Sequence, residues 1–400
     1  MIGVAGRRKA ARSLAQALIA STAWIALFAG SSFAATGDWP MFADGPAHNG
    51  VNRGETILTP ANAGGLGVVN AYGGWRVLEN TAPYQIVAGS YGYGVALGGG
   101  YASTYVTAYH LPSGQVAWRR KISTNGCTGH YIPAVSNGVL FVGGSSAMYA
   151  FDATTGAKLW AKWVQSCSEF NAVTVKGNSV YASTYYGEKV YDFDAATGAV
   201  VWVRHPAEPY VQGPVSVSGP LAYVLDDALY AYDATSGALV YKVGTGYFSG
   251  TPVVSGGLVF IQTPDGLVAR NASDGSSVWS VPLDSWGGDL TPAVDGDTIV
   301  AATARYVRAF VASSGAPRWT VDGGAGAYYR TPALANGVVY AGSLENGLQA
   351  VDQATGQVLY TSRTDSVWSC DDPVVGHGVV YVPCHLDGWQ YQMDVFGLSA

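Results

Sequence analysis

Polar and acidic side chains recur at intervals of about 40 residues, each time just before a proline or alanine that leads into an apolar run. Carboxylate and amide groups make directed hydrogen bonds, and neighbouring aromatic rings offer flat apolar walls. Such a set could hold a sugar, a peptide strand or a flat ring system. The candidates are His130, Tyr131, Glu169, Asn171, Gln212, Asp289, Tyr329, Arg330, Asp371 and Asp372, and Tyr328 is one of the aromatic residues near them.

The adjacent Asp371 and Asp372 could also supply oxygen ligands to calcium, although acidic pairs in loops are more often simply solvated. The sequence lacks the G-x-S-x-G and H-E-x-x-H motifs of hydrolases and zinc proteases. The lone histidines, His48 among them, have no visible partner in the sequence. The alternative to a binding site is that the polar residues cover the mouth of a channel and bond water and turn backbones.

The four cysteines form an even set without C-x-x-C spacing, which favours disulfides in an oxidising compartment over a metal site. Cys370 and Cys384 lie 7 residues on either side of His377, so a regular hairpin would bring them face to face. Cys127 and Cys167 lie in the loops that lead into two consecutive apolar runs. We predict the pairs Cys127–Cys167 and Cys370–Cys384, and free buried thiols are the alternative.

A turn motif repeats seven times and indicates what positions these loops. Its clearest copies are Ala150-Phe-Asp-Ala-Thr-Thr-Gly156 before Trp160 and Ala231-Tyr-Asp-Ala-Thr-Ser-Gly237 before Tyr241. The seven glycines are 42, 42, 39, 38, 40 and 41 residues apart. Asp can bond the backbone of the turn, and Gly can adopt the positive φ that the turn requires. A fixed period of this length is typical of a propeller or solenoid.

Each repeat predicts four short strands, and the aromatic residue of the outermost strand is expected to pack against the next blade. Burying one such ring removes roughly 150–250 Å² from water, so these residues are interpreted as structural. They are Trp75, Trp118, Trp160, Trp202, Tyr241, Trp279, Trp319 and Tyr360. The loops into each innermost strand and those between the second and third strands share one face, named the mouth face below.

Counting the repeats predicts an all-β, eight-bladed propeller, with seven blades as the alternative. The last repeat ends at Ala400 without an outermost strand, whereas residues 68–77 at the other end of the propeller place Trp75 in phase with Trp118. This N-terminal strand should therefore complete the last blade and close the ring, which removes the exposed sheet edges.

The N-terminus reads as a signal peptide, residues 1–34, followed by a leader segment, residues 35–67, and the propeller, residues 68–400. A basic start precedes an apolar stretch, and cleavage is expected after Ala34; an uncleaved anchor is the alternative. Outside it, no segment is long and apolar enough to span a bilayer. A net charge of −6 argues against a nucleic-acid partner. We expect a secreted or periplasmic protein.

The A-x-D-x-x-T-G-x-x-x-W turn resembles the tryptophan-docking repeat of the quinoprotein (pyrroloquinoline quinone, PQQ) propeller superfamily. The resemblance covers residues from about 68 to 400, and the leader with Trp39-Pro-Met-Phe42 looks like the opening of bacterial PQQ-repeat proteins. It implies either a PQQ- and calcium-dependent alcohol or sugar dehydrogenase or a non-enzymatic propeller such as the barrel-assembly lipoprotein of the outer membrane. The repeats here are short, and the adjacent cysteines of many of the dehydrogenases are missing.

The sequence therefore favours an exported module that binds a ligand or protein at its mouth face and does not favour catalysis. The partner could be a small molecule, a glycan or a protein. A PQQ- and calcium-dependent dehydrogenase and a polysaccharide-binding or polysaccharide-cleaving propeller are the alternatives.

Overall fold

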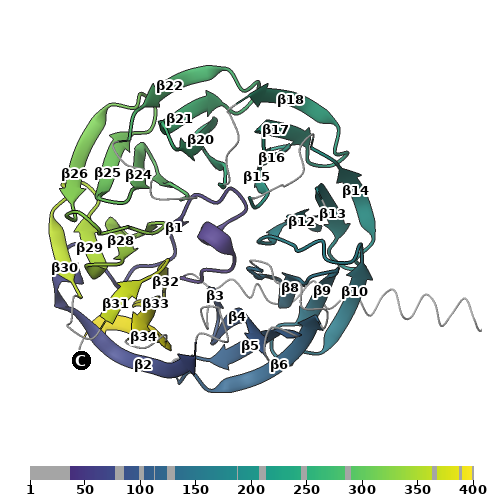
Figure 1. Cartoon of the computed structure of the whole chain (residues 1–400), viewed down its shortest axis with the longest axis horizontal. Helices are drawn as coiled ribbons and strands as arrows, with labels where there is room; N and C mark the ends of the chain where they lie inside the picture. Colours follow the sequence, from purple (N-terminus) through teal and green to yellow (C-terminus); the bar gives the residue numbers. More distant parts are fainter. Residues whose placement is uncertain are drawn as a thin grey trace, which may run out of the picture.

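The computed structural model describes residues 37–76, 85–98, 103–111, 113–123, 131–186, 188–206, 213–244, 250–283, 290–362, 367–386 and 390–398. These residues form eight sheets of mainly antiparallel strands, arranged as blades around a central axis (Figure 1). The predicted eight-bladed propeller is confirmed, and the seven-blade alternative is not. The predicted signal peptide lies outside the described residues.

Each blade runs from a three-residue innermost strand to a strand at the perimeter. Blades 1 to 4 consist of β3 (Ile86–Ala88), β4 (Tyr91–Gly98), β5 (Ser103–His110) and β6 (Val116–Ser123); β7 (Ala134–Ser136), β8 (Val139–Gly143), β9 (Ala147–Asp152) and β10 (Lys158–Trp163); β11 (Thr174–Lys176), β12 (Ser179–Thr184), β13 (Lys189–Asp194) and β14 (Val200–Arg204); β15 (Ser216–Ser218), β16 (Leu221–Leu225), β17 (Ala228–Asp233) and β18 (Leu239–Gly244).

Blades 5 to 8 continue the same order, with one additional strand in each of the last two. They consist of β19 (Val253–Ser255), β20 (Leu258–Thr263), β21 (Gly266–Asn271) and β22 (Ser277–Val281); β23 (Ala293–Asp295), β24 (Thr298–Ala302), β25 (Tyr306–Val311) and β26 (Pro317–Asp322); β1 (Val51–Asn52), β27 (Ala333–Ala335), β28 (Val338–Ser343), β29 (Gly347–Asp352) and β30 (Val358–Thr361); β31 (Val367–Cys370), β32 (Val374–Gly376), β33 (Val379–Leu386), β34 (Gln390–Leu398) and β2 (Leu66–Arg76). Two 3₁₀ turns, η1 (Phe42–Asp44) and η2 (Ala63–Gly65), lie in the leader.

The ring closes by pairing its two chain ends, as the sequence predicts. β2 pairs antiparallel with β34 from Leu66 opposite Leu398 to Arg76 opposite Gln390. The first strand of the propeller is thus the outermost strand of the last blade. Because this strand leads into the first repeat and pairs with the last one, it closes the ring.

Aromatic residues of the outermost strands dock on the next blade. The indole N–H of Trp160 donates to the carbonyl oxygen of Ala195 at 2.9 Å, and that of Trp202 donates to Ala234 at 3.0 Å. Gly198 follows the turn with φ +71°, and a Cβ there would lie 2.6 Å from the Trp160 ring. Glycine is therefore required at this position for two reasons: the backbone has a positive φ, and the ring leaves no room for a Cβ.

The aspartate of each turn holds the receiving surface in shape. Oδ1 of Asp152 accepts hydrogen bonds from the backbone N–H and the hydroxyl of Thr155, both at 2.7 Å. Asp194 and Thr197 repeat the arrangement in the next blade. These bonds within the turn hold the docking glycine in place without any contribution from the ring.

Asp192 breaks this pattern from inside blade 3. In six other blades an alanine with no solvent exposure occupies the same place, two residues before the turn aspartate or its equivalent, namely Ala108, Ala150, Ala231, Ala269, Ala309 and Ala350. Asp192 is 1% exposed; Oδ2 accepts from the Ser179 hydroxyl at 3.2 Å, and Oδ1 has no hydrogen-bond partner among the described residues. Burial raises the pKa of this carboxyl to about 7, and the Ser179 hydroxyl opposes that rise.

Replacing Asp192 by alanine should stabilise the propeller. Because the folded pKa is raised above the unfolded value, the native state holds a proton that the unfolded chain has lost, and stability falls as the pH rises from about 4 to 7. We expect D192A to raise the free energy of unfolding by about 1–3 kcal/mol at pH 8 and by less at pH 5. Urea unfolding of both proteins at the two pH values measures this.

The matched control is D194A, two residues away, which removes the turn bonds to Thr197 and should destabilise by about 1 kcal/mol. A D192A protein that is less stable than the parent at pH 8 would contradict the assignment of Asp192 as a buried, poorly satisfied acid.

Candidate functional site

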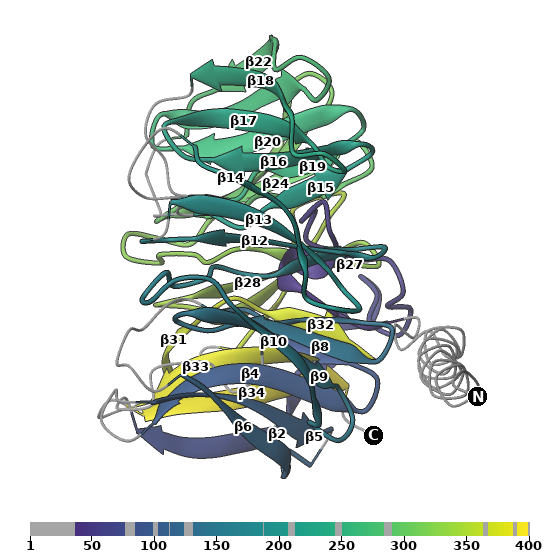
Figure 2. The same ribbon diagram turned by 90° about the vertical axis from the view of Figure 1, so that its right-hand side faces the viewer.

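The leader occupies the centre of the ring and crosses the innermost strands in order. Backbone hydrogen bonds link Trp39 to Val87 of β3 and Pro40 to Val135 of β7. Further along, the leader carbonyls of Pro46, Ala47, Asn49 and Gly50 accept from N–H groups of the innermost strands, namely Val217, Val254, Val294 and Leu334. Figure 1 shows this segment, in purple, inside the ring, and Figure 2 shows it toward one side of the disc.

Two leader side chains complete the circuit at the remaining blades. His48 is fully buried, with Nε2 2.8 Å from the Thr174 hydroxyl of β11 and Nδ1 2.7 Å from the Phe42 carbonyl oxygen. Burial lowers the pKa of His48. The Asn52 amide donates to Val375 of β32 at 2.8 Å. The sequence shows no partner for His48, because its Nε2 partners Thr174 and Val215 are more than 100 residues away and its Nδ1 partner is a backbone carbonyl.

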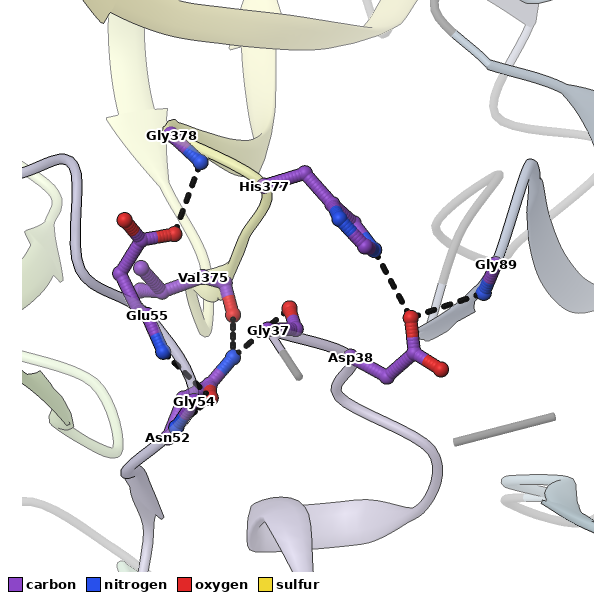
Figure 3. Close-up of polar contacts among 9 residues, drawn as sticks. All are labelled: Gly37, Asp38, Asn52, Gly54, Glu55, Gly89, Val375, His377 and Gly378. Atoms are coloured by element: carbon purple, nitrogen blue, oxygen red, sulfur yellow. Dashed lines mark hydrogen bonds and ion pairs between the residues drawn. The ribbon is translucent and has the colours of Figure 1, made fainter. Parts of the chain in front are cut away.

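Polar contacts of the leader lie at the turns between the innermost and second strands (Figure 3). Nε2 of His377 lies 2.8 Å from Oδ1 of Asp38, and the same oxygen accepts from the Gly89 N–H at 2.8 Å. Asp38 raises the pKa of His377 by this hydrogen bond. Oε2 of Glu55 accepts from Gly378 N–H at 2.7 Å. The leader thus covers the face opposite the mouth face and ties the first and last blades together there.

The mouth-face candidates that the structure describes form two separate groups. Tyr131 leads into blade 2, and Glu169 and Asn171 lead into blade 3. Arg330 leads into blade 7, and Asp371 and Asp372 lead into blade 8. Blades 3 and 7 stand opposite one another in an eight-membered ring, so the candidates do not converge on one point. His130, Gln212 and Asp289 lie outside the described residues.

The first group is largely engaged in the fold. Tyr131 is 1% exposed, and Glu169 and Asn171 are each 8% exposed. The Asn171 amide donates to the Ser183 hydroxyl at 2.9 Å, and the Glu169 carbonyl oxygen accepts from the Tyr185 N–H at 2.8 Å. The backbone of Glu169 adopts φ +51°. These contacts fit residues that shape the loops of blade 3.

The second group presents charge to solvent. Nε of Arg330 lies 3.2 Å from Oδ1 of Asp371, with 37% and 30% of the two side chains exposed. Oδ1 of Asp372 accepts from the Thr331 N–H at 2.9 Å, across the boundary between blades 7 and 8. Part of the Asp372 side chain is exposed to solvent. Desolvation by the protein around the carboxyl group, together with the nearby Asp371 carboxylate, raises the pKa of Asp372 to about 6.

Two neighbouring tyrosines of blade 7 have opposite roles. Tyr329 is 1% exposed, and its hydroxyl donates to Oε1 of Gln349 inside the blade. Tyr328 is 50% exposed and lies two residues before Arg330 in the chain. The side chain available to a ligand is therefore Tyr328, which the sequence grouped only with the nearby aromatic residues.

A disulfide anchors the acidic pair. Cys370 and Cys384 are paired in register on β31 and β33, with their Cα atoms 4.1 Å apart, as predicted. Cys370 immediately precedes Asp371, so the cross-link fixes the start of this loop. Cys167 is also disulfide-bonded, and its predicted partner Cys127 lies outside the described residues.

The described residues do not fit a calcium-dependent quinone site. They contain no group of three or more His, Cys, Asp or Glu side chains that could hold a metal ion. The Asp371 carboxylate already faces the guanidinium of Arg330. Calcium needs six to eight oxygen ligands, and a cation beside one of them opposes binding.

No helix in the described part of the chain is long and apolar enough to cross a membrane.

Comparison with known sequences identifies a matching family model and several relatives. The family described as outer membrane protein assembly factor BamB matches residues 102–211 and 187–382. The chain is 26% identical over 292 residues to outer membrane protein assembly factor BamB of Moranella endobia (strain PCIT), which covers 67% of this chain and 66% of that protein. It is 33% identical over 191 residues to the factor of the same name from Yersinia pestis, covering 43% and 48% of the two chains. The matches thus span about half to two thirds of these relatives.

Solved structures share the fold. BamB from Moraxella catarrhalis superposes with a TM-score of 0.60 at 18% identity, covering 83% of this chain and 99% of that one. A europium-containing methanol dehydrogenase gives 0.69 at 12% identity, covering 94% and 100%. The quinohemoprotein alcohol dehydrogenase of Comamonas testosteroni gives 0.69 at 13% identity, covering 95% and 85%. At such identities the likeness concerns the fold alone.

Replacing Asn52 should weaken the attachment of the leader to the face opposite the mouth face. Its amide donates to Gly37 and Val375, and Oδ1 accepts from the N–H groups of Gly54 and Glu55, with 2% of the residue exposed. We expect N52A to lower the free energy of unfolding by about 2–4 kcal/mol, because buried backbone groups lose their partners. Denaturant unfolding measures this. The exposed Asn178 is the control, and an N52A loss no larger than that of N178A would contradict the role of the leader.

Proposed function

The chain belongs to the β-propeller family described as outer membrane protein assembly factor BamB, and from this premise we propose that it is a protein-binding scaffold of the cell envelope that holds a polypeptide partner at its mouth face. The mouth face is the side of the ring that the leader does not cover. The leader covers the innermost turns at Gly89, His377 and Gly378, so a partner of the channel has access from the mouth face.

The observation that carries the proposal is the exposed group at blades 7 and 8. Tyr328 and Arg330 are of the residue types that dominate the energy of protein interfaces, and Asp371 and Asp372 stand beside them. A polypeptide offers N–H groups to the carboxylates, carbonyls and carboxylates to the guanidinium, and apolar side chains to the tyrosine ring. The disulfide and the blade framework hold these groups in place, which lowers the entropy lost on binding.

We propose a periplasmic location on the same premise. The relatives are named for assembly at the outer membrane, and the basic and apolar N-terminal sequence fits a chain that is exported. A periplasmic position would also suit the disulfides. The dehydrogenase alternative has less support, because the described residues lack a calcium site and the quinoproteins share only the fold.

Photocrosslinking tests the mouth face directly. A benzoylphenylalanine in place of Tyr328 should crosslink to a discrete protein in envelope extract. In a pull-down without the crosslinker, Y328A/R330Q/D371N should capture about tenfold less of that protein than the parent does, or less still, as expected for interface hot spots. Circular dichroism checks that the variants fold.

The control, Y186A/E188Q/K189Q, likewise removes one tyrosine, one acidic and one basic side chain, on the opposite side of the mouth face, where Tyr186 is 53% exposed. It should capture the partner as well as the parent does. Equal capture by both triple variants would exclude this group as the binding site. Elution of the captured material by a glycan, with no crosslinked protein, would favour the polysaccharide alternative.

A further inference from the structure

Basic residues are concentrated in one arc of the ring. Residues 85–163, which contain blades 1 and 2, carry five basic and one acidic side chains, whereas residues 164–400 carry ten basic and 22 acidic side chains. All five basic residues lie on the outermost strands, Arg119, Arg120 and Lys121 on β6 and Lys158 and Lys162 on β10. The two strands are neighbours at the perimeter (Figure 1). This surface, the basic rim, is cationic although the chain as a whole is anionic.

Four cations of the basic rim lack acidic partners. On other blades exposed basic residues face carboxylates, as in Lys242–Asp227, Arg305–Asp322 and Arg318–Asp297. Within the described residues, no ion pair involves Arg119, Lys121, Lys158 or Lys162, all of which are exposed. Arg120 differs, because it donates to the carbonyl oxygens of Thr155 and Gly156 in the docking turn.

Two of these cations meet over one aromatic ring. Arg119 Cζ lies 4.2 Å from the centroid of Tyr105, and Lys121 Nζ lies 6.0 Å from it. Like charges held this close repel one another, and an anion between them would relieve the repulsion. A phosphate group suits this place, since it accepts several charge-assisted hydrogen bonds from guanidinium and ammonium groups.

The basic rim also carries an exposed indole. Trp163 ends β10 with 65% of its surface exposed, whereas the docking Trp160 of the same strand donates to the next blade. An exposed tryptophan beside lysines is the combination found where proteins meet lipid headgroups, because the ring is apolar and its N–H is polar. An acidic polypeptide would explain the charges but would leave this ring without a purpose.

We propose that the basic rim of blades 1 and 2 binds the phosphate headgroups of an anionic lipid membrane. Arg119 and Lys121 receive a headgroup phosphate over Tyr105, Lys158 and Lys162 add to the attraction, and Trp163 enters the interface. This surface is separate from the group at blades 7 and 8, so a partner at the mouth face and a membrane at the rim can be bound together.

Vesicle sedimentation tests the proposal with the full exported chain. The parent should bind vesicles of phosphatidylcholine with 40% phosphatidylglycerol and leave pure phosphatidylcholine vesicles in solution. R119Q/K121Q/K158Q/K162Q should bind the anionic vesicles about tenfold or more weakly, since each cation near an anionic surface contributes to binding. W163A should weaken binding by a smaller factor, and raised salt should weaken that of the parent.

The control K176Q/K242Q/R305Q/R318Q removes the same charge from other blades and should stay within about twofold of the parent, because its residues lie outside the rim. Parent binding that does not depend on phosphatidylglycerol, or a rim variant that binds as the control does, would overturn the proposal. Binding of the parent to soluble polyglutamate, with no binding to the anionic vesicles, would assign the rim to an acidic polypeptide instead.

Discussion

The whole ring depends on the contact between an aromatic ring on one blade and the turn of the next. Trp118, Trp202 and Trp279 each donate an indole N–H to a carbonyl oxygen of the following blade. Each ring also lies so close to the turn glycine of that blade that a Cβ there would clash with it. Each ring removes roughly 150–250 Å² from water. Because the ring and the glycine are part of one repeat, each repeat that carries both can donate a ring to the next blade and receive one from the blade before it.

Docking between successive blades does not by itself join the last blade to the first. The chain makes this connection in two places, at the perimeter and near the axis. At the perimeter, β2 completes the sheet of β34, so separation of the ends would break a continuous ladder. Near the axis, the leader bonds innermost strands around the ring and fastens His377 and Gly89 to Asp38. The inner closure lies on the face opposite the mouth face, at the turns that carry Gly89 and His377.

The repeat made the fold predictable, since strand number, docking residues and the closing strand all follow from one period. The Cys370–Cys384 pair was also predictable, because a hairpin relates the two residues locally. The leader could not be placed in the same way. Its partners are eight strands spread over the chain, and a buried His48 looks like any loop histidine. At the mouth, sequence phase selected Tyr329 although the exposed ring is Tyr328, because phase does not fix which side of a short loop faces the core.

The three surfaces of the disc can take separate roles because the docking contacts lie between blades and leave the faces free to vary. One face is committed to closure by the leader. The docking turns lie between the third and fourth strands of each blade, on the face opposite the mouth face, so Arg330, Asp371 and Asp372 take no part in the docking contacts. The perimeter is equally independent: on β10, Trp160 packs inward while Lys158 and Lys162 stay exposed. An eight-fold scaffold held by internal contacts can therefore acquire a protein site and a membrane site on different arcs without either one weakening the other.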